Sequence, residues 1–106
     1  MSAPEELLAL QLRAVGIPFE REVVLPELKP RRWRWDFVIG RLLIEVHGGT
    51  WIQGKHSRGP GQHNDAEKQN SATVAGYSVL TVMPVHIKGG QALAWIEAMV
   101  RRAHGA

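Results

Sequence analysis

Residues 32–46 read R-W-R-W-D-F-V-I-G-R-L-L-I-E-V and carry the clearest secondary-structure pattern of the chain. Its first half alternates with the two-residue period of a β-strand. One face of the predicted strand carries the apolar side chains of Trp33, Trp35, Phe37 and Ile39. The other face carries Arg32, Arg34, Asp36 and Val38. The pair at residues 40–41, Gly-Arg, is typical of a tight type II′ turn, and residues 42–46 continue as an antiparallel strand. The stretch therefore predicts a β-hairpin.

A two-residue turn fixes which side chains face each other across this hairpin. With Ile39 opposite Leu42, counting back sets Asp36 directly opposite Glu45. Cβ atoms of such a pair lie about 4.5–5.5 Å apart, and two like charges there destabilise a sheet unless something binds between them. Mg²⁺ is typically held by one or two carboxylates with water and phosphate oxygens, so the pair predicts a metal site. His47, two residues after Glu45, falls on the same face, where it can complete the metal shell or orient or deprotonate a water.

Helical and strand patterns surround the hairpin. Two stretches repeat apolar residues at helical spacing, and Asn-Asp-Ala-Glu at residues 64–67 is a capping motif that opens another helix. The predicted helices cover residues 5–15, 64–75 and 91–103. The predicted strands outside the hairpin cover residues 20–25 and 77–82, the latter closed by Pro84. The order α-β-β-β-α-β-α predicts one α/β domain over residues 1–106, with a mixed central sheet flanked by helices.

Composition narrows the classes of function. The chain has 106 residues, of which 44% are hydrophobic and 22% charged, as in an ordinary globular domain. No run is long and apolar enough to span a bilayer, and the N-terminus lacks a signal-peptide pattern, so we expect a cytoplasmic protein. The absence of cysteine excludes disulfides and thiolate zinc sites, which leaves hard cations as the expected metals. A net charge of +3 permits an anionic partner without demanding one.

Two basic segments suit contacts with nucleic acid. Residues 47–61, H-G-G-T-W-I-Q-G-K-H-S-R-G-P-G, are predicted as a long loop in which Trp51 is a candidate for stacking on a base. Basic side chains of this loop that can face phosphates are Lys55, His56 and Arg58. The second segment lies beside the acidic strand and contains Lys29, Arg31, Arg32 and Arg34. It predicts salt-sensitive phosphate binding, although a charged edge that discourages strand pairing is the alternative.

The pattern resembles the PD-(D/E)XK superfamily of restriction-endonuclease-like nucleases. That signature places an acid on one strand and an acid-x-Lys triplet on the next, the places held here by Asp36 and by Glu45-Val46-His47. The stretches W-R-W-D-F, L-I-E-V-H-G-G-T-W and N-D-A-E-K-Q-N look most like compact phage-type and very-short-patch-repair-like endonucleases. The resemblance implies a restriction-endonuclease-like core and Mg²⁺- or Mn²⁺-dependent hydrolysis of DNA phosphodiesters.

The resemblance also implies further site residues. Because His47 stands where the family has lysine, Lys68 from the predicted second helix is expected to supply the positive charge. An acid on the first helix often assists such sites, and Glu6 matches that position, with Glu5 as its rival. His56 and Asp65 resemble auxiliary residues of the repair-like relatives.

Other interpretations stay open at this stage. The two strand acids can be solvated residues on an open sheet face, and Glu6 can be a first-turn acid favoured by the helix dipole. The chain can also be a nuclease-fold module that binds DNA with little catalysis, or a subunit of a phage or mobile-element complex. The sequence leaves both a monomer and a homodimer possible.

Overall fold

The computed structural model describes residues 3–28, 33–47 and 60–105, with side chains described for the same ranges except 60–65 and 105. Four helices are found in these ranges: α1 (Ala3–Ala14), α2 (Pro60–Val74), α3 (Pro84–Lys88) and α4 (Gln91–Gly105). The strands there are β1 (Glu20–Val24), β2 (Arg34–Ile39), β3 (Leu42–Val46) and β4 (Ser78–Val82). The predicted order of elements is confirmed, with α3 as an addition.

The strands form one mixed sheet in the order β1-β2-β3-β4. β2 pairs antiparallel with β1 and β3, whereas β3 and β4 run parallel. At the hairpin Ile39 faces Leu42 and Phe37 faces Ile44, as the two-residue turn predicted. Gly40 has φ 59°, a value that favours glycine and fits the first central position of a type II′ turn. The mixed sheet flanked by helices is therefore the predicted fold class.

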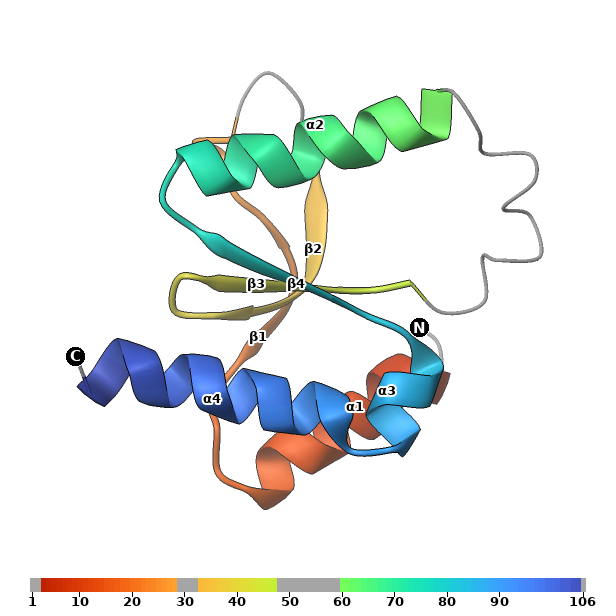
Figure 1. Cartoon of the computed structure of the whole chain (residues 1–106), viewed down its shortest axis with the longest axis vertical. Helices are drawn as coiled ribbons and strands as arrows, with labels where there is room; N and C mark the ends of the chain where they lie inside the picture. The colour runs from red at the N-terminus through yellow and green to blue at the C-terminus, as the bar shows by residue number, and fades with distance from the viewer. Residues whose placement is uncertain (1–2, 29–32, 48–59, 106) are drawn as a thin grey trace.

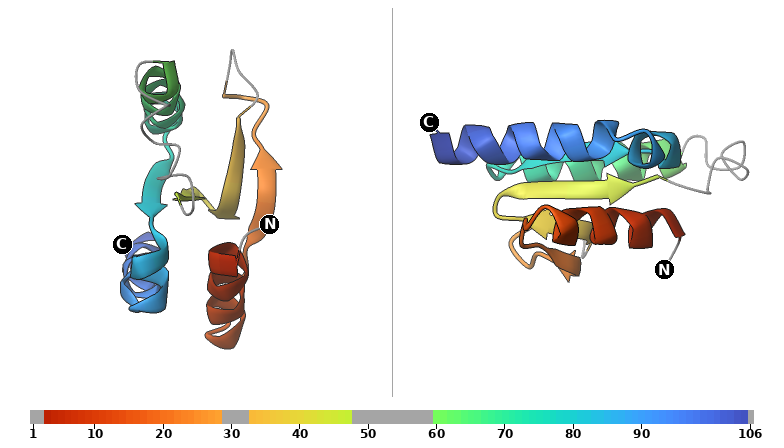
Figure 2. Two further views of the ribbon diagram at one scale, coloured as in Figure 1. Left: turned by 90° about the vertical axis from the view of Figure 1, so that its right-hand side faces the viewer. Right: turned by 90° about the horizontal axis from the view of Figure 1, so that it is seen from below.

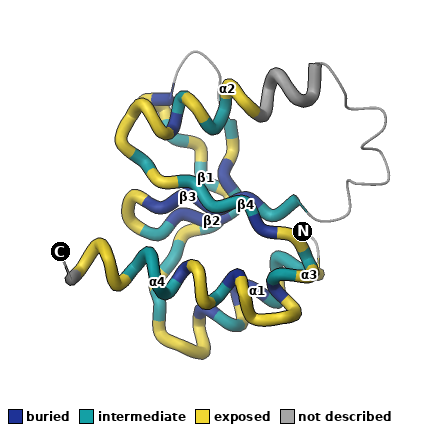
Figure 3. The backbone as a smooth tube through the Cα atoms, viewed as in Figure 1, coloured by how far each residue is buried: buried dark blue, intermediate teal, exposed yellow. Residues whose placement is uncertain are grey.

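Helices cover both faces of the sheet (Figures 1 and 2). One buried cluster joins the sheet to α1, α3 and α4 through Leu8, Leu12, Phe37, Ile44, Ile87 and Ile96. A second cluster lies between the sheet and α2 and contains Leu28, Trp35, Val38, Leu43 and Ala72. Buried positions gather on the strands and on the helix sides turned toward them (Figure 3). Since the apolar area of both faces leaves water, this two-sided packing supplies the main driving force for the fold.

The β1–β2 ribbon changes faces half-way along its length. Phe37 and Ile39 pack with the α1 side, yet Trp35, two residues before Phe37, belongs to the cluster under α2. A regular strand would place Trp35 and Phe37 on the same face. The prediction of one continuous apolar face is therefore wrong, and Trp33 precedes β2 rather than lying in it. The reason is that the side-chain direction reverses at Asp36. Asp36 is therefore the residue at which β2 changes faces.

Two other boundaries differ from the prediction. Pro84, expected only to close β4, is the first residue of α3, a position where its fixed φ and missing N–H cost little. In the same way Pro60 begins α2, so this helix starts earlier than the capping motif indicated and takes the end of the predicted loop. Residues 48–59 of that loop lie outside the described residues. Among the described helices, none has both the length and the apolar character needed to cross a bilayer.

Candidate active site

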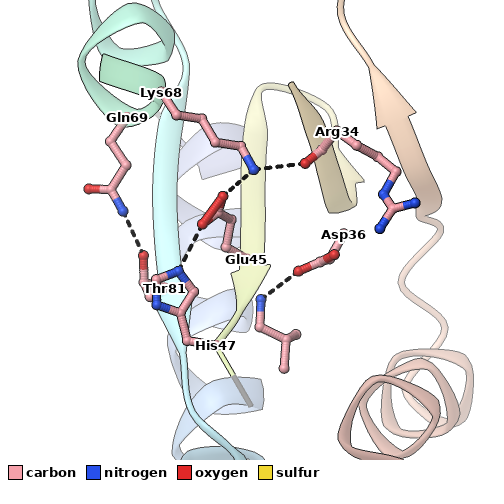
Figure 4. Close-up of polar contacts among 8 residues, drawn as sticks. Arg34, Asp36, Glu45, His47, Lys68, Gln69 and Thr81 are labelled. Atoms are coloured by element: carbon pink, nitrogen blue, oxygen red, sulfur yellow. Dashed lines mark hydrogen bonds and ion pairs between the residues drawn. The ribbon is translucent and has the colours of Figure 1, made fainter. Parts of the chain in front are cut away.

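Glu45 is the buried acid at the centre of the candidate site (Figure 4). It lies near the end of β3, two residues after Leu43, so the strand period directs it to the face covered by α2. Only 6% of the residue is exposed. One carboxylate oxygen contacts His47 Nε2 at 2.9 Å and the other forms an ion pair with Lys68. A charged group at this depth needs such partners, because burying an unpaired carboxylate costs several kcal/mol.

Lys68 reaches the site from α2. Its ammonium ion-pairs with Glu45, donates a hydrogen bond to the Arg34 carbonyl at 2.8 Å, and lies 4.5 Å from the centroid of the Trp35 ring. Ala72, one helical turn later, is buried against the sheet, so helical spacing turns Lys68 inward. The three contacts fix the position of the charge. The predicted lysine from the second helix is thus brought to Glu45.

The surroundings of Glu45 favour its ionised form. Burial raises the pKa of this carboxyl, but the hydrogen bonds and charges of His47 and Lys68 outweigh burial and hold the pKa below its ordinary value of 4.5. The site therefore keeps a carboxylate, rather than a carboxylic acid, near neutral pH.

This depressed pKa predicts how stability depends on pH. Because the folded-state pKa lies below the unfolded one, ionised Glu45 contributes stability that is present above pH 4.5 and lost as the pH falls through the folded-state pKa. We expect the unfolding free energy of the wild type to fall more steeply below pH 4.5 than that of Glu45→Gln. Urea unfolding of both proteins between about pH 3 and pH 7 measures this difference. Parallel pH profiles would show that Glu45 gains nothing from its partners.

Asp36 lies on β2, at the residue where the strand changes faces. Its Oδ2 accepts a hydrogen bond from the Val46 N–H at 2.8 Å. The β2–β3 ladder runs from Ile39↔Leu42 to Phe37↔Ile44 and does not include the predicted opposition of Asp36 and Glu45. The predicted register is confirmed, but the predicted Asp36–Glu45 pair is wrong, because the β2–β3 ladder ends one pair before it. The Asp36 carboxylate instead bridges to β3 next to Glu45 (Figure 4).

Glu5, rather than Glu6, is the helix acid near Asp36. The Glu5 side chain is 17% exposed and lies 3.7 Å from the Arg21 guanidinium. Burial first, and then the negative charge of Asp36, raise the pKa of Glu5. The Glu6 side chain is half exposed. Its carboxylate accepts a hydrogen bond from Arg21 at 3.1 Å, and this bond lowers the pKa of Glu6. Of the two helix acids, Glu5 is thus the one whose charge interacts with Asp36, and the catalytic role predicted for Glu6 stays a prediction.

The remaining predicted residues divide by whether they are described. His47 shares the face of Glu45, as expected, and its side chain is 35% exposed. Arg34 has 62% of its side chain exposed and lies 3.8 Å from Glu22. Outside the described residues lie Arg31, Arg32, Trp51, Lys55, His56 and Arg58, while only the backbone of Asp65 is described.

Sequence reasoning missed two features beside the site. Trp35 was assigned to the opposite face, so its contact with Lys68 was not foreseen. Gln69, next to Lys68 on α2, donates a hydrogen bond to Thr81 Oγ1 at 3.0 Å, and Thr81 pairs with Glu45 in the β3–β4 ladder. A polar residue facing inward from the edge strand was the available signal for this pair.

The side chains present fit a hard cation. Asp36, Glu45 and Glu5 offer carboxylate oxygens, which Mg²⁺ and Mn²⁺ prefer, and Mg²⁺ needs only one or two of them. Within the described ranges, no group of three metal-ligating side chains stands close enough to form a closed metal centre. The carboxylates present thus fit the ligand chemistry of such an ion, whose remaining ligands would be water and substrate oxygens.

Comparisons with known proteins support the fold. No family model matches the chain, and no curated protein matches it. Among solved structures, the catalytic domain of the homing endonuclease I-Bth0305I is similar, with a TM-score of 0.72, 21% sequence identity and 100% coverage of both chains. At this identity the likeness concerns the fold, and the chain thus has the mixed α/β core that the homing endonuclease domain has.

Proposed function

We propose that this chain is a metal-dependent endonuclease that hydrolyses DNA phosphodiester bonds, as a divergent relative of the PD-(D/E)XK nucleases. The observation that carries the proposal is the cluster in which buried Glu45 contacts His47 and Lys68 while Asp36 bridges to the neighbouring backbone. Two acids with a fixed ammonium beside them match the acid-acid-lysine signature. The shared fold with a homing endonuclease catalytic domain supports the same reaction class.

Each group of the cluster has a role in this proposal. Asp36 and Glu45 would hold Mg²⁺ or Mn²⁺, and Glu5 adds negative charge beside Asp36. When bound, the ion would supply Lewis-acid polarisation of the phosphate and help to activate water. Lys68 stabilises the negative charge that builds on the phosphate oxygens, because its ammonium is already held in place.

His47 is the proton acceptor in this scheme. Its Nε2 contacts Glu45 at 2.9 Å, so the carboxylate orients the ring. Partial exposure leaves the ring accessible to a water that attacks the phosphorus. His47, which stands where the family's triplet has lysine, thereby takes the proton of the attacking water.

Basic side chains next to the acids bind the phosphates of the DNA in this proposal. Arg34 is exposed on β2, two residues before Asp36, and its exposure supports a role in binding a phosphate. The segment with Arg31 and Arg32 and the loop with Trp51, Lys55, His56 and Arg58 are proposed to extend this contact. Affinity should then fall steeply with salt.

Cleavage of supercoiled plasmid by the purified chain tests the function. With Mg²⁺ or Mn²⁺ we expect nicked or linear products, and with EDTA none. Cleavage that persists in EDTA would contradict the metal dependence. Salt-sensitive DNA binding without cleavage in either ion would instead favour the alternative, a nuclease-fold module that binds DNA without cutting it.

A further inference from the structure

Glu22 has an unusual backbone conformation in the middle of β1. Among the described residues it is the one non-glycine residue with positive φ, at 53°. A side chain in this left-handed region crowds the backbone, and such strain persists where the surrounding structure enforces it. Glu22 lies between the ladder pairs Arg21↔Phe37 and Val23↔Trp35, at the level of Asp36.

The β1–β2 ribbon turns over at this level. On one side of it, Arg21 lies 5.2 Å from the Phe37 ring and contacts the acids of α1. On the other side, Val23 and Trp35 pack into the cluster under α2. Residues two apart thus face opposite ways on both strands. The left-handed conformation of Glu22 accounts for this reversal on β1.

The reversal changes which groups bond across to β3. Ile39 and Leu42 flank a two-residue turn and form a hydrogen-bonded pair, and such pairs recur at every second position. In a continued ladder the Val46 N–H would therefore meet the Trp35 carbonyl. Instead it donates to Asp36 Oδ2, and the Arg34 carbonyl accepts from Lys68. The reversal thus brings the Asp36 carboxylate to the Val46 N–H and the Arg34 carbonyl to the Lys68 ammonium.

We propose that Glu22 is a positioning residue, whose left-handed backbone aims Asp36 at β3 and the Arg34 carbonyl at Lys68. This inference rests on the proposed function, in which Asp36 and Lys68 act on DNA. The Glu22 carboxylate itself is not the agent, since its contact with Arg34 is 3.8 Å long and exposed. The backbone conformation is what matters.

A substitution series at Glu22 separates backbone from side chain. Gly and Asn tolerate the left-handed region, Ala resists it about as much as the wild-type Glu, and the β-branched residues Val and Thr resist it more. Glu22→Gly, Glu22→Asn and Glu22→Ala should bind Mn²⁺ within about twofold of the wild type, because none of them disfavours the backbone conformation more than Glu does. Glu22→Val and Glu22→Thr should bind Mn²⁺ and cleave DNA about 10- to 100-fold more weakly, as when a supporting group of a metal site is lost. Calorimetric titration with Mn²⁺ and the plasmid assay give the two readouts.

Two further measurements keep the test decisive. Glu20→Val makes the same change at an exposed position of β1 without positive φ, and should behave as wild type. The Val46 amide resonance should shift in Glu22→Val and Glu22→Thr toward its position in Asp36→Ala, but not in Glu22→Gly or Glu22→Ala. Glu22→Thr carries the test if Glu22→Val does not fold.

The outcomes distinguish the two proposals. If the wild type neither binds Mn²⁺ nor cleaves, the proposed function fails, while the Val46 amide still decides whether Glu22 places Asp36. If the wild type is active and all five Glu22 variants bind Mn²⁺ alike with an unchanged Val46 amide, Glu22 has no positioning role and this inference is overturned.

Discussion

Asp36→Asn is expected to reduce metal-dependent DNA cleavage by at least about 100-fold, because it removes a proposed metal ligand. The amide oxygen of Asn can still accept the hydrogen bond from the Val46 N–H. The link between β2 and β3 should therefore survive, and the unfolding free energy should change by less than about 1 kcal/mol. Initial cleavage rates with Mg²⁺ and urea unfolding of the same preparation measure the two effects.

The two adjacent acids of α1 provide a matched control. Glu5→Gln removes a charge beside Asp36, whereas Glu6→Gln removes a charge that is half exposed and paired with Arg21. We expect cleavage to drop in Glu5→Gln and to stay near wild type in Glu6→Gln. An Asp36→Asn protein that still cleaves at the wild-type rate would refute the site.

The hairpin could be predicted because its determinants are local. A Gly-X pair between two apolar runs specifies the turn, and the turn specifies the first ladder pairs, which the structure confirms from Ile39↔Leu42 to Phe37↔Ile44. The next pair depends on β1, whose conformation at Glu22 turns the ribbon over. Nothing in the period of β2 carries this information, so the predicted Asp36–Glu45 opposition is wrong, although Glu45 lies on β3 and Asp36 bonds to the next residue of that strand.

The helix acid shows what a closer reading of periodicity could have given. The buried residues of α1 are Leu8, Ala9 and Leu12. Glu5 precedes them by three, four and seven residues, so it shares their face, whereas Glu6 does not. The same reasoning explains Lys68, which precedes buried Ala72 by four residues. Spacing to the core would have selected Glu5 from the sequence.

Tertiary packing around Lys68 was not predictable in the same way. The Lys68 ammonium contacts the Arg34 carbonyl and the Trp35 ring. Both groups face α2 only because β1 and β2 change faces half-way along their length. The sequence places a lysine on the inner face of a helix. Which backbone carbonyl accepts its hydrogen bond is decided by a strand distant in the chain.

Lys68→Met is expected to have the largest effect on stability. The side chains of Glu45 and Lys68 are 8% and 15% exposed, so the variant leaves a buried carboxylate without its main countercharge. Breaking a buried ion pair on one side costs about 3 kcal/mol. The loss should appear as a lower urea midpoint at neutral pH, and cleavage should fall by about 100-fold because the charge that stabilises the phosphate is gone.

The double variant Glu45→Gln/Lys68→Met separates pairing from packing. If the cost of Lys68→Met comes from an unpaired carboxylate, neutralising Glu45 removes that cost, and the double variant should be more stable than Lys68→Met by about 1–3 kcal/mol. If Lys68 instead stabilises the fold by packing its stem over Trp35, the two substitutions should add. The cleavage defect cannot be repaired in the double variant under either account, because the proposed reaction needs the acid and the ammonium together. A stable but inactive double variant would therefore show that the fold does not need this buried ion pair. The pair would then be required for cleavage alone.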